Sequence, residues 1–348
     1  MGYIIMEKLD PLSVVVERLK SSDKKDFNHP DYELNEIRIS ADDFLLQYPR
    51  GAYTSARTVK RHSIMDLQGH IDRTVNSMQL IKFIPKNENS SEANHDDNEV
   101  EPPHITQELI PYRDPDTFKK MILPLLRIGL LRYYEIEESS SWHIKGKGEA
   151  KVTFLICYSF EKNRPMLTLH FTPLHAPSTP KCKVEMYGEP RKSAEAKDSK
   201  WVRERNVLEL SKHPGFNEIL LSDSHTHNVY EGLSSNFFAV LYNPDKREPL
   251  VITAPLQYVL EGTILKIVRM VCERDKIDLQ FWFPNADDAE HWEGAFITST
   301  SRLVLPIELI KFRDGRPTLK LPPHNDTIEH IKNEVEKEIT HRAYRVLW

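Results

Sequence analysis

The run VYEGLSSNFFAV occupies residues 229–240, in the most strand-like part of the sequence. NEILLSD precedes it, with HTH at the turn, and NFFAVLY leads on to PLVITAP. Short apolar and aromatic runs bounded by turn residues are typical of strands joined by hairpins. We therefore predict consecutive strands through this region, with Glu231 and Gly232 at a hairpin edge.

The rest of the sequence shows two periodicities. Apolar residues at steps of three and four predict helices, and short β-branched runs between turn residues predict strands. Pro124 is expected to kink its helix or to mark the true start of that helix. In chain order, the expected elements around the quoted run are helices over 66–80 and 117–135, strands over 150–160, 166–173 and 182–187, a helix over 201–212, then a helix over 261–275, strands over 278–283 and 297–310, and a helix over 326–344.

A polar run and a proline-rich run divide the chain. KNENSSEANHDDNEVEP, residues 86–102, has almost no apolar residue, which predicts a solvated, disordered insertion. PLHAPSTPK, residues 173–181, concentrates proline and small polar residues, as domain boundaries do. The predicted organisation is an N-terminal extension (1–34), an N-terminal α/β domain (35–173), a linker (174–181) and a C-terminal strand-rich domain (182–348).

Composition narrows the classes of function. The chain is 39% hydrophobic, which is enough for a real core, and its formal net charge of −5 gives no general attraction to nucleic acid. Three cysteines without C-x-x-C spacing indicate neither a disulfide framework nor a zinc site, and His225 and His227 lack an evident third metal ligand. No apolar run is long enough for a signal peptide or a membrane span. We expect a cytoplasmic protein without metal, membrane or nucleic-acid partners.

Residues 229–240 closely resemble the E-G-x-x-x-N-x-F-x-V signature of the class IV (fold type IV) pyridoxal-phosphate enzymes. This family contains branched-chain aminotransferases, D-amino-acid aminotransferases and aminodeoxychorismate lyases. In the family the glutamate bonds the pyridine nitrogen of pyridoxal 5′-phosphate (PLP) and keeps it protonated, which makes the ring a better electron sink. The resemblance assigns that role to Glu231. The alternative interpretation is that Glu231 is a structural residue at the edge of a hairpin. The fixed positions of the signature are filled by Glu231, Gly232, Asn236, Phe238 and Val240.

Three further segments resemble family blocks that bind the cofactor phosphate. Residues 51–81, beginning GAYTSART, are similar to a block with an H-x-x-R helix, so Arg73 would bind the phosphate through its guanidinium. Residues 259–271, VLEGTILKIVRMV, are similar to the L-P-G-I-T-R stretch that opens a helix and offers backbone amides to the phosphate. ITSTSRLVLPI, residues 297–307, is similar to a run of small hydroxyl residues. The donors implied in these last two segments are Thr263, Ile264, Ser299, Thr300 and Ser301.

The family holds PLP covalently on a lysine that precedes the glutamate motif, and two lysines compete for that place. Both Lys197 and Lys200 precede Glu231 by a stretch that fits one helix and one strand. Asp198 or Ser199 is a natural N-cap of the next helix, which places Lys197 at the end of the preceding segment. VEMYGEPRKSAEAK also resembles the family's Pro-Arg lead-in to this lysine. We assign Lys197, with Lys200 as the alternative.

The sequence departs from the family pattern at three places. Glu261 stands where proline is usual, and Leu265 where arginine is frequent. The stretch from Trp201 onward lacks the tyrosine or other polar side chain that contacts the phenolic oxygen of the cofactor. These departures bear on catalysis more than on the fold.

The resemblance implies an α+β fold of two domains, an N-terminal α/β sandwich and a C-terminal strand-rich pseudo-barrel with helices, with PLP between them and two chains in a homodimer. The activity expected first is transfer of an amino group from an amino acid to a 2-oxo acid. A PLP lyase similar to aminodeoxychorismate lyase is the alternative, since GAYTSART is most similar to that branch. A catalytically impaired member that acts as a binding protein is a third possibility.

Overall fold

The computed structural model describes residues 12–19, 30–85, 100–139 and 148–348. Residues 86–99, which make up most of the expected insertion, lie outside the described residues. The chain divides into two compact units, each with its own set of contacts. The first comprises Met1–Leu174, Asp198–Val202 and Tyr344–Trp348, and the second comprises His175–Lys197 and Arg203–Ala343.

The first unit is built on a seven-stranded sheet in the order β16-β4-β3-β5-β6-β1-β2. The expected hairpin is present, with β5 and β6 antiparallel. β1 and β2 also belong to this sheet, so these residues are not an extension outside the fold. β2 was not predicted from the sequence, because this edge strand has mostly exposed side chains and therefore no regular apolar alternation. The strands are β1 (Leu12–Arg18), β2 (Tyr32–Arg38), β3 (Gly51–Val59), β4 (Ser63–Met65), β5 (Ala150–Ser159), β6 (Arg164–Pro173) and β16 (Ala343–Arg345).

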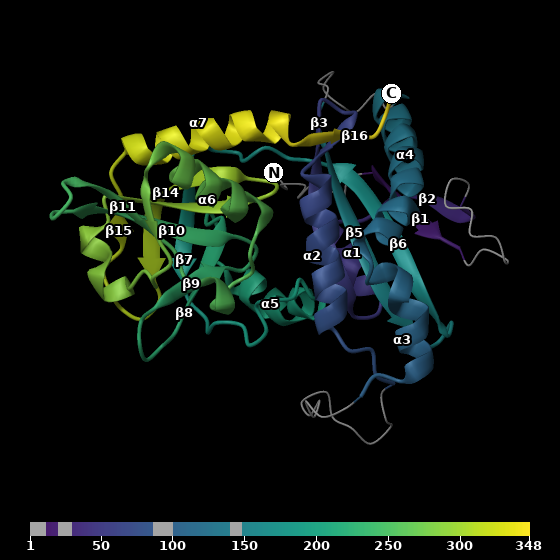
Figure 1. Ribbon diagram of the computed structural model, residues 1–348. Helices are drawn as coiled ribbons and strands as arrows, with labels where there is room; N and C mark the ends of the chain where they lie inside the picture. The colour runs from purple at the N-terminus through teal and green to yellow at the C-terminus, as the bar shows by residue number, and fades with distance from the viewer. Residues whose placement is uncertain (1–11, 20–29, 86–99, 140–147) are drawn as a thin grey trace, which may run out of the picture. The chain divides into compact units, whose positions relative to one another are not determined.

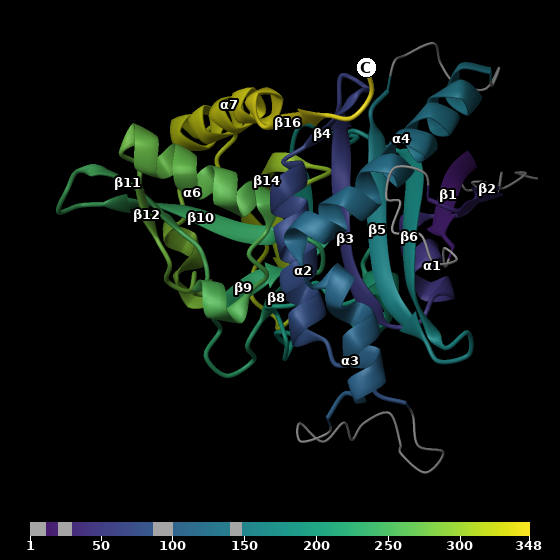
Figure 2. The ribbon, with the colours of Figure 1, turned by 45° about the vertical axis from the view of Figure 1, so that its right-hand side comes forward.

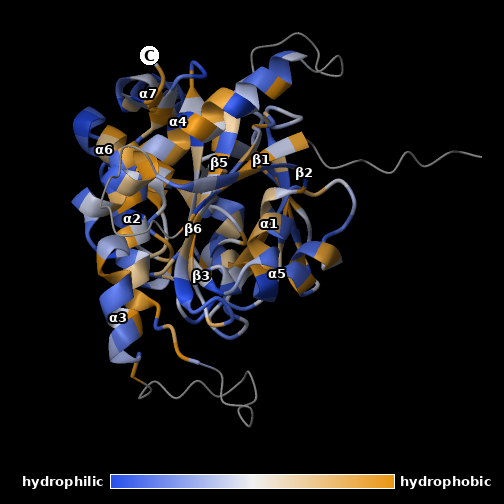
Figure 3. Ribbon diagram, turned by 90° about the vertical axis from the view of Figure 1, so that its right-hand side faces the viewer, coloured by the Kyte–Doolittle hydropathy of each residue, from blue (hydrophilic) through white to orange (hydrophobic). Residues whose placement is uncertain are grey.

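Helices cover both faces of this sheet. α2 (Leu67–Leu80) and α4 (Pro115–Ser139) pack on one face (Figure 2), where the Phe171 ring lies so close to α4 that a Cβ on Gly129 would come within 2.0 Å of it. α1 (Ala41–Gln47) packs its Phe44 on the other face. Bands of hydrophobic and hydrophilic residues alternate along α4 (Figure 3), as expected for a helix with one buried side. α4 begins at Pro115, so the expectation that Pro124 could start it is wrong. The unit also contains α3 (Pro103–Leu109) and η1 (Ile110–Tyr112).

The second unit is a closed barrel of strands (Figure 1). Successive pairing runs β10-β13-β14-β7-β8-β9, and β9 pairs back with β10 to complete the ring. β11 and β12 extend the sheet beyond β10, and β15 pairs with β14. The expected α+β fold with a strand-rich C-terminal part is thus confirmed. The strands are β7 (Cys182–Met186), β8 (Glu218–Ser222), β9 (Val229–Gly232), β10 (Asn236–Asn243), β11 (Glu248–Ile252), β12 (Asp278–Gln280), β13 (Gly294–Ser299), β14 (Leu303–Phe312) and β15 (Leu319–Lys320).

The single strand expected over residues 297–310 is wrong. β13 ends at Ser299 and β14 begins at Leu303, and the two are antiparallel, with a tight turn between them. The run of small hydroxyl residues has β propensity but also favours turns, and here the turn prevails. The remaining elements of the second unit are α6 (Thr263–Asp275), α7 (Asp326–His341), η2 (Leu256–Tyr258) and η3 (Ala286–His291), while α5 (Lys200–Ser211) begins in the first unit and ends in the second.

α6 and α7 pack against each other and against β13 and β14 of the barrel. Their apolar positions Val268, Val271, Ile331 and Val335 are fully buried, as the spacing predicts. Within the described part of the chain, each helix is too short or too polar to cross a membrane.

Candidate cofactor site

Glu231 lies in β9, and its carboxylate is buried. Arg191 Nε donates a hydrogen bond to Oε1 at 2.6 Å, and the backbone amide of Leu260 donates one to Oε2 at 3.1 Å. Burial raises the pKa of the Glu231 carboxyl, and the Arg191 guanidinium opposes that shift. A cation and an amide thus hold this acid–base group in one position. The sequence indicated Arg191 only as part of a Pro-Arg lead-in.

Asn236 holds the segment that leads into α6. Its Nδ2 donates to the carbonyl of Leu260 at 2.7 Å, and it lies opposite Glu231 in the strand pairing. A Cβ on Gly262 would lie only 2.4 Å from Asn236 Oδ1, so only glycine fits there without a shift. Asn236 and Gly262 therefore bring the start of α6 close to Glu231.

Gly232, the glycine of the signature, also lies where a Cβ would come too close to neighbouring side chains. A Cβ on Gly232 would lie 2.3 Å from Ser235 Oγ and 3.0 Å from Glu218 Cγ. The Gly232 amide also donates to the Ser235 carbonyl at 2.7 Å, which closes a tight loop between β9 and β10. Close approach of side chains, rather than backbone flexibility, excludes larger residues at this position.

The N-terminus of α6 has the chemistry of an anion site. Gly262 is the N-cap, and the first turn, which begins with Thr263 and Ile264, carries no carboxylate. Glu261, which replaces the usual proline, pairs its carboxylate with Lys266 at 3.2 Å and with Arg269 at 3.3 Å. Those cations offset its charge, so the departure does not place an uncompensated anion at the helix N-terminus. Leu265 is buried in the core, which accounts for an apolar residue at that position.

Ser299, Thr300 and Ser301 lie at the turn between β13 and β14. The hydroxyl oxygens of Ser299 and Ser301 are 3.4 Å apart, and the Arg302 amide donates to Ser299 Oγ at 3.2 Å. Hydroxyls and amides at a tight turn are suitable donors for a phosphate group.

The two lysines have different environments. Lys197 is half-buried, and its charge opposes the rise in the pKa of Glu231 that burial causes. Lys200 is exposed and begins α5. The backbone amide of Lys200 donates a hydrogen bond to Asp198 Oδ1 at 2.8 Å, and Arg50 Nε donates to Asp198 Oδ2 at 2.8 Å. Of the two residues expected as N-cap, Asp198 and Ser199, Asp198 thus accepts from the first residue of the helix.

Arg73 belongs to the first unit, where it is buried on α2. Its Nη2 donates to Thr54 Oγ1 at 2.5 Å and contacts His70 Nδ1 at 3.0 Å. Thr54 Oγ1 and His70 Nδ1 are themselves 2.9 Å apart. β3 and the H-x-x-R helix therefore bring these three side chains together and orient the guanidinium.

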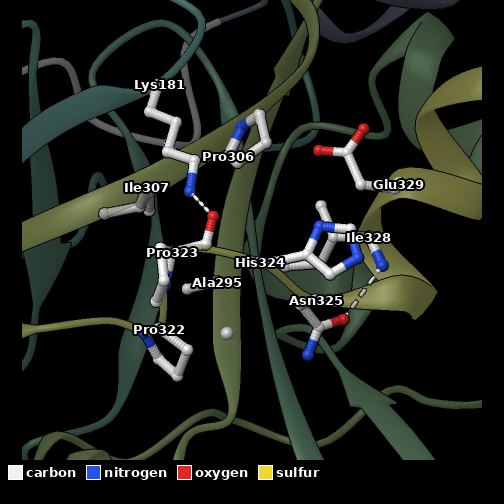
Figure 4. Close-up of a pocket in the computed structure, with 11 residues that line it drawn as sticks. Lys181, Ala295, Pro306, Ile307, Pro322, Pro323, His324, Asn325, Ile328 and Glu329 are labelled. Atoms are coloured by element: carbon white, nitrogen blue, oxygen red, sulfur yellow. Dashed lines mark hydrogen bonds between the residues drawn. The ribbon is translucent and has the colours of Figure 1, made fainter.

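A narrow crevice at the start of α7 is a separate feature of the second unit (Figure 4). Lys181 and prolines line it, and Lys181 Nζ donates to the Pro323 carbonyl. Glu329, in the first turn of α7, also lines the crevice. Because of this carboxylate, the crevice is poorly suited to bind an anion. Within the described residues no group of three or more His, Cys, Asp or Glu side chains could hold a metal, and His227 instead pairs with Asp287 at 2.9 Å.

The residues of the second unit suit a phosphate-bearing pyridine cofactor. Gly262 leaves a cradle beside Asn236 that a Cβ would fill, and the first turn of α6 carries no carboxylate. The buried Glu231 offers an acceptor of the kind that a pyridine N–H needs. An acceptor for the ring and donors for the phosphate therefore occur in the same unit.

Comparison with known proteins agrees with this chemistry. The family model for amino-transferase class IV matches residues 136–310. No curated protein matches the chain in sequence. The chain belongs to the class IV aminotransferase family, and it is a PLP-dependent enzyme of that family.

Solved structures share the fold at low sequence identity. A hypothetical aminotransferase from Mycobacterium tuberculosis in its PLP-bound form is 15% identical, with a TM-score of 0.61, over 94% of this chain and 99% of that one. A branched-chain aminotransferase from Thermoproteus uzoniensis with norvaline is 13% identical, with a TM-score of 0.61, over 90% and 97%. A fold IV-transaminase from Curtobacterium pusillum is 13% identical, with a TM-score of 0.61, over 93% and 98%.

Proposed function

We propose that this enzyme transfers the amino group of an amino acid to a 2-oxo acid, with Lys197 as its catalytic lysine. The observation that carries this proposal is the environment of Glu231. Its carboxylate is buried against Arg191 and the Leu260 amide, and the charge of Lys197 in the same unit opposes the rise in its pKa. Lys200, by contrast, is exposed, which favours Lys197 of the two lysines.

In this proposal each residue has a defined task. PLP supplies an electron-withdrawing pyridinium ring that stabilises negative charge at the substrate Cα. Lys197 Nζ removes the proton from Cα as a general base and later returns a proton as a general acid. The Glu231 carboxylate holds the proton on the pyridine nitrogen, and Arg191 orients that carboxylate.

The phosphate-binding residues are assigned from the family motifs and their local chemistry. Arg73 contributes a guanidinium whose orientation is set by Thr54 and His70. In the second unit, amides at the start of α6 and donors at the β13–β14 turn satisfy an acceptor-only dianion. The residues proposed to bind the phosphate are Arg73, Thr263, Ile264, Ser299, Thr300 and Ser301.

Absorption spectroscopy tests the lysine assignment. Purified protein supplemented with PLP is expected to show visible absorbance from covalently bound cofactor. Lys197→Ala should abolish this absorbance and Lys200→Ala should leave it. The reverse result would transfer the role to Lys200, and colourless wild-type protein would contradict the proposed function.

A substrate screen tests the reaction. An aminotransferase consumes an amino donor only when a 2-oxo acid acceptor is present, so omitting the acceptor should stop turnover. Turnover without any acceptor would favour the lyase alternative, for which the comparisons offer no support. Coloured protein that turns over no donor would favour the non-catalytic alternative.

We further propose that the protein acts as a homodimer in the cytoplasm. Support comes from the family resemblance and from the reduced state expected for its cysteines, since Cys157, Cys182 and Cys272 are all free and buried. Light scattering on the PLP-loaded protein measures the mass directly, and a monomeric mass would contradict the dimer.

A further inference from the structure

The turn that carries Ser299 and Ser301 has an unusual backbone. Leu303, directly after the turn, has a φ of +56°, in the left-handed region. Branched, non-glycine residues rarely adopt this conformation, and it persists only where the surrounding structure holds it. Something beyond the local sequence must therefore fix the turn.

An ion pair with a buried carboxylate ties the turn to β8. Arg302 Nη2 lies 2.5 Å from Glu218 Oε2, and Glu218, the first residue of β8, is almost fully buried. The Arg302 guanidinium holds the pKa of the Glu218 carboxyl below its usual value, against the effect of burial. The carboxylate is therefore charged, and Arg302 is its principal counterion.

Arg302 also determines the direction of the Ser299 hydroxyl. Its backbone amide donates to Ser299 Oγ at 3.2 Å, and its Nε donates to the same oxygen at 3.3 Å. A hydroxyl has two acceptor positions and one hydrogen. Because Arg302 occupies both acceptor positions, Ser299 can act only as a donor, either to Ser301 Oγ at 3.4 Å or to a ligand.

Ser234 and Ser235, in the loop after Glu231, differ from Ser299 because their hydroxyl hydrogens already have acceptors. Ser234 Oγ and Ser235 Oγ each donate to Glu218 Oε2 at 3.0 Å. Their hydrogens are therefore used within the protein, and they are poor donors for a ligand. Glu218 thus connects the loop after Glu231 with the turn after β13.

We propose that Glu218 and Arg302 are positioning residues that orient the Ser299 hydroxyl as a hydrogen-bond donor to the phosphate of the cofactor. This inference rests on the proposed function, because it takes the β13–β14 turn as part of the phosphate site. It adds that the pair acts on the phosphate of the ligand and not on its ring. A phosphate dianion accepts hydrogen bonds only, which matches a hydroxyl whose acceptor positions are filled.

The test compares two ligands that differ only in the phosphate. PLP and pyridoxal are titrated into wild-type protein, Glu218→Gln, Arg302→Met and Ser299→Ala, and binding is followed by absorbance. We expect each variant to lose PLP affinity on the order of tenfold, as for other residues that orient a ligating group. Pyridoxal affinity should stay as in wild-type protein, and the ³¹P resonance of bound PLP should shift.

Controls separate positioning from folding. Glu308→Gln removes a half-exposed carboxylate from β14 and should change neither affinity. The double variant Glu218→Gln, Arg302→Met leaves no buried charge unpaired, so it should fold even if a single variant does not. In thermal melts it should resemble wild-type protein and still lose the preference for PLP.

Two results would overturn the inference. Variants that keep the wild-type ratio of PLP to pyridoxal affinity would show that the pair does not act on the phosphate. An equal loss of both ligands would show a merely structural role. Wild-type protein that binds neither ligand would instead contradict the proposed function itself.

Discussion

Glu231 and Asn236 lie opposite each other across β9 and β10, and their pairing closes the barrel. Both side chains bind Leu260: Glu231 accepts from its amide, and Asn236 donates to its carbonyl. The closure of the barrel and the position of the segment before α6 therefore depend on the same two residues. This relationship explains why the signature requires both.

Replacing Asn236 with alanine should weaken both the fold and the cofactor site. The change removes the bond to Leu260 and leaves its carbonyl without that donor, which costs about 1–3 kcal/mol. Urea unfolding measures the stability, and a PLP titration measures the affinity. Asn206→Ala, at an exposed position of α5, is the matched control. Wild-type stability and PLP affinity in Asn236→Ala would refute the role of its bond to Leu260.

Gly262→Ala should be destabilising because of one contact. The new Cβ would lie 2.4 Å from Asn236 Oδ1, while the φ of −68° at Gly262 is acceptable for alanine. Overpacking of this kind costs about 1–3 kcal/mol. The double variant with Asn236→Ala should lose less than the sum of the two single changes, because the clash is gone. Strictly additive losses in urea unfolding would show that the clash has another source.

Arg191→Met should destabilise the protein and shift its pH profile. Removing one partner of a buried ion pair costs about 3–5 kcal/mol. The pKa of Glu231, already raised by burial, should rise further without the guanidinium, so the carboxylate is lost at a higher pH as the solution is acidified. The acid limb of kcat/KM should move to higher pH. Arg203→Met, an exposed change on α5, should leave the limb in place. An unmoved limb in Arg191→Met would contradict the pairing.

His170 should make the first unit sensitive to acid. It is fully buried and stacks on Phe44 with ring centroids 4.8 Å apart, and burial lowers its pKa from 6.5 to about 3. The unfolded chain therefore binds a proton below pH 6.5 that the folded protein does not. Stability from this residue is complete above pH 6.5 and is lost at about 1.4 kcal/mol per pH unit as the pH falls towards 3. His170→Phe should flatten this slope in urea unfolding at a series of pH values, and an unchanged slope would refute it.

The local sequence pattern was sufficient to predict most helices and strands and part of the cofactor site. The apolar steps of α2, α6 and α7 and the alternating runs of β5 and β6 correspond to elements that the structure contains. The signature indicated Glu231 and Asn236, and the helix signal at Thr263 was close to the observed N-cap. These signals are readable because each depends on residues within one or two turns of the chain.

The predictions from sequence were wrong where the pairing of strands distant in the chain determines the secondary structure. β2 is an edge strand with few buried side chains, so its place in the sheet depends on β1. The hydroxyl run after Ile297 became a turn because β13 and β14 pair back on each other. Neither preference is visible from the local sequence alone.

The sequence by itself determined the family, most of the helices and strands around the signature, and the residue types that suit PLP. Only the tertiary structure decided that Arg191 neutralises Glu231, that Asn236 holds Leu260, and that Glu218 pairs with Arg302. Each of these contacts joins residues far apart in the chain, and a buried charge is stable only where the fold supplies its partner. The sequence shows where a charged residue is, but only the closed barrel shows which distant residue lies beside it.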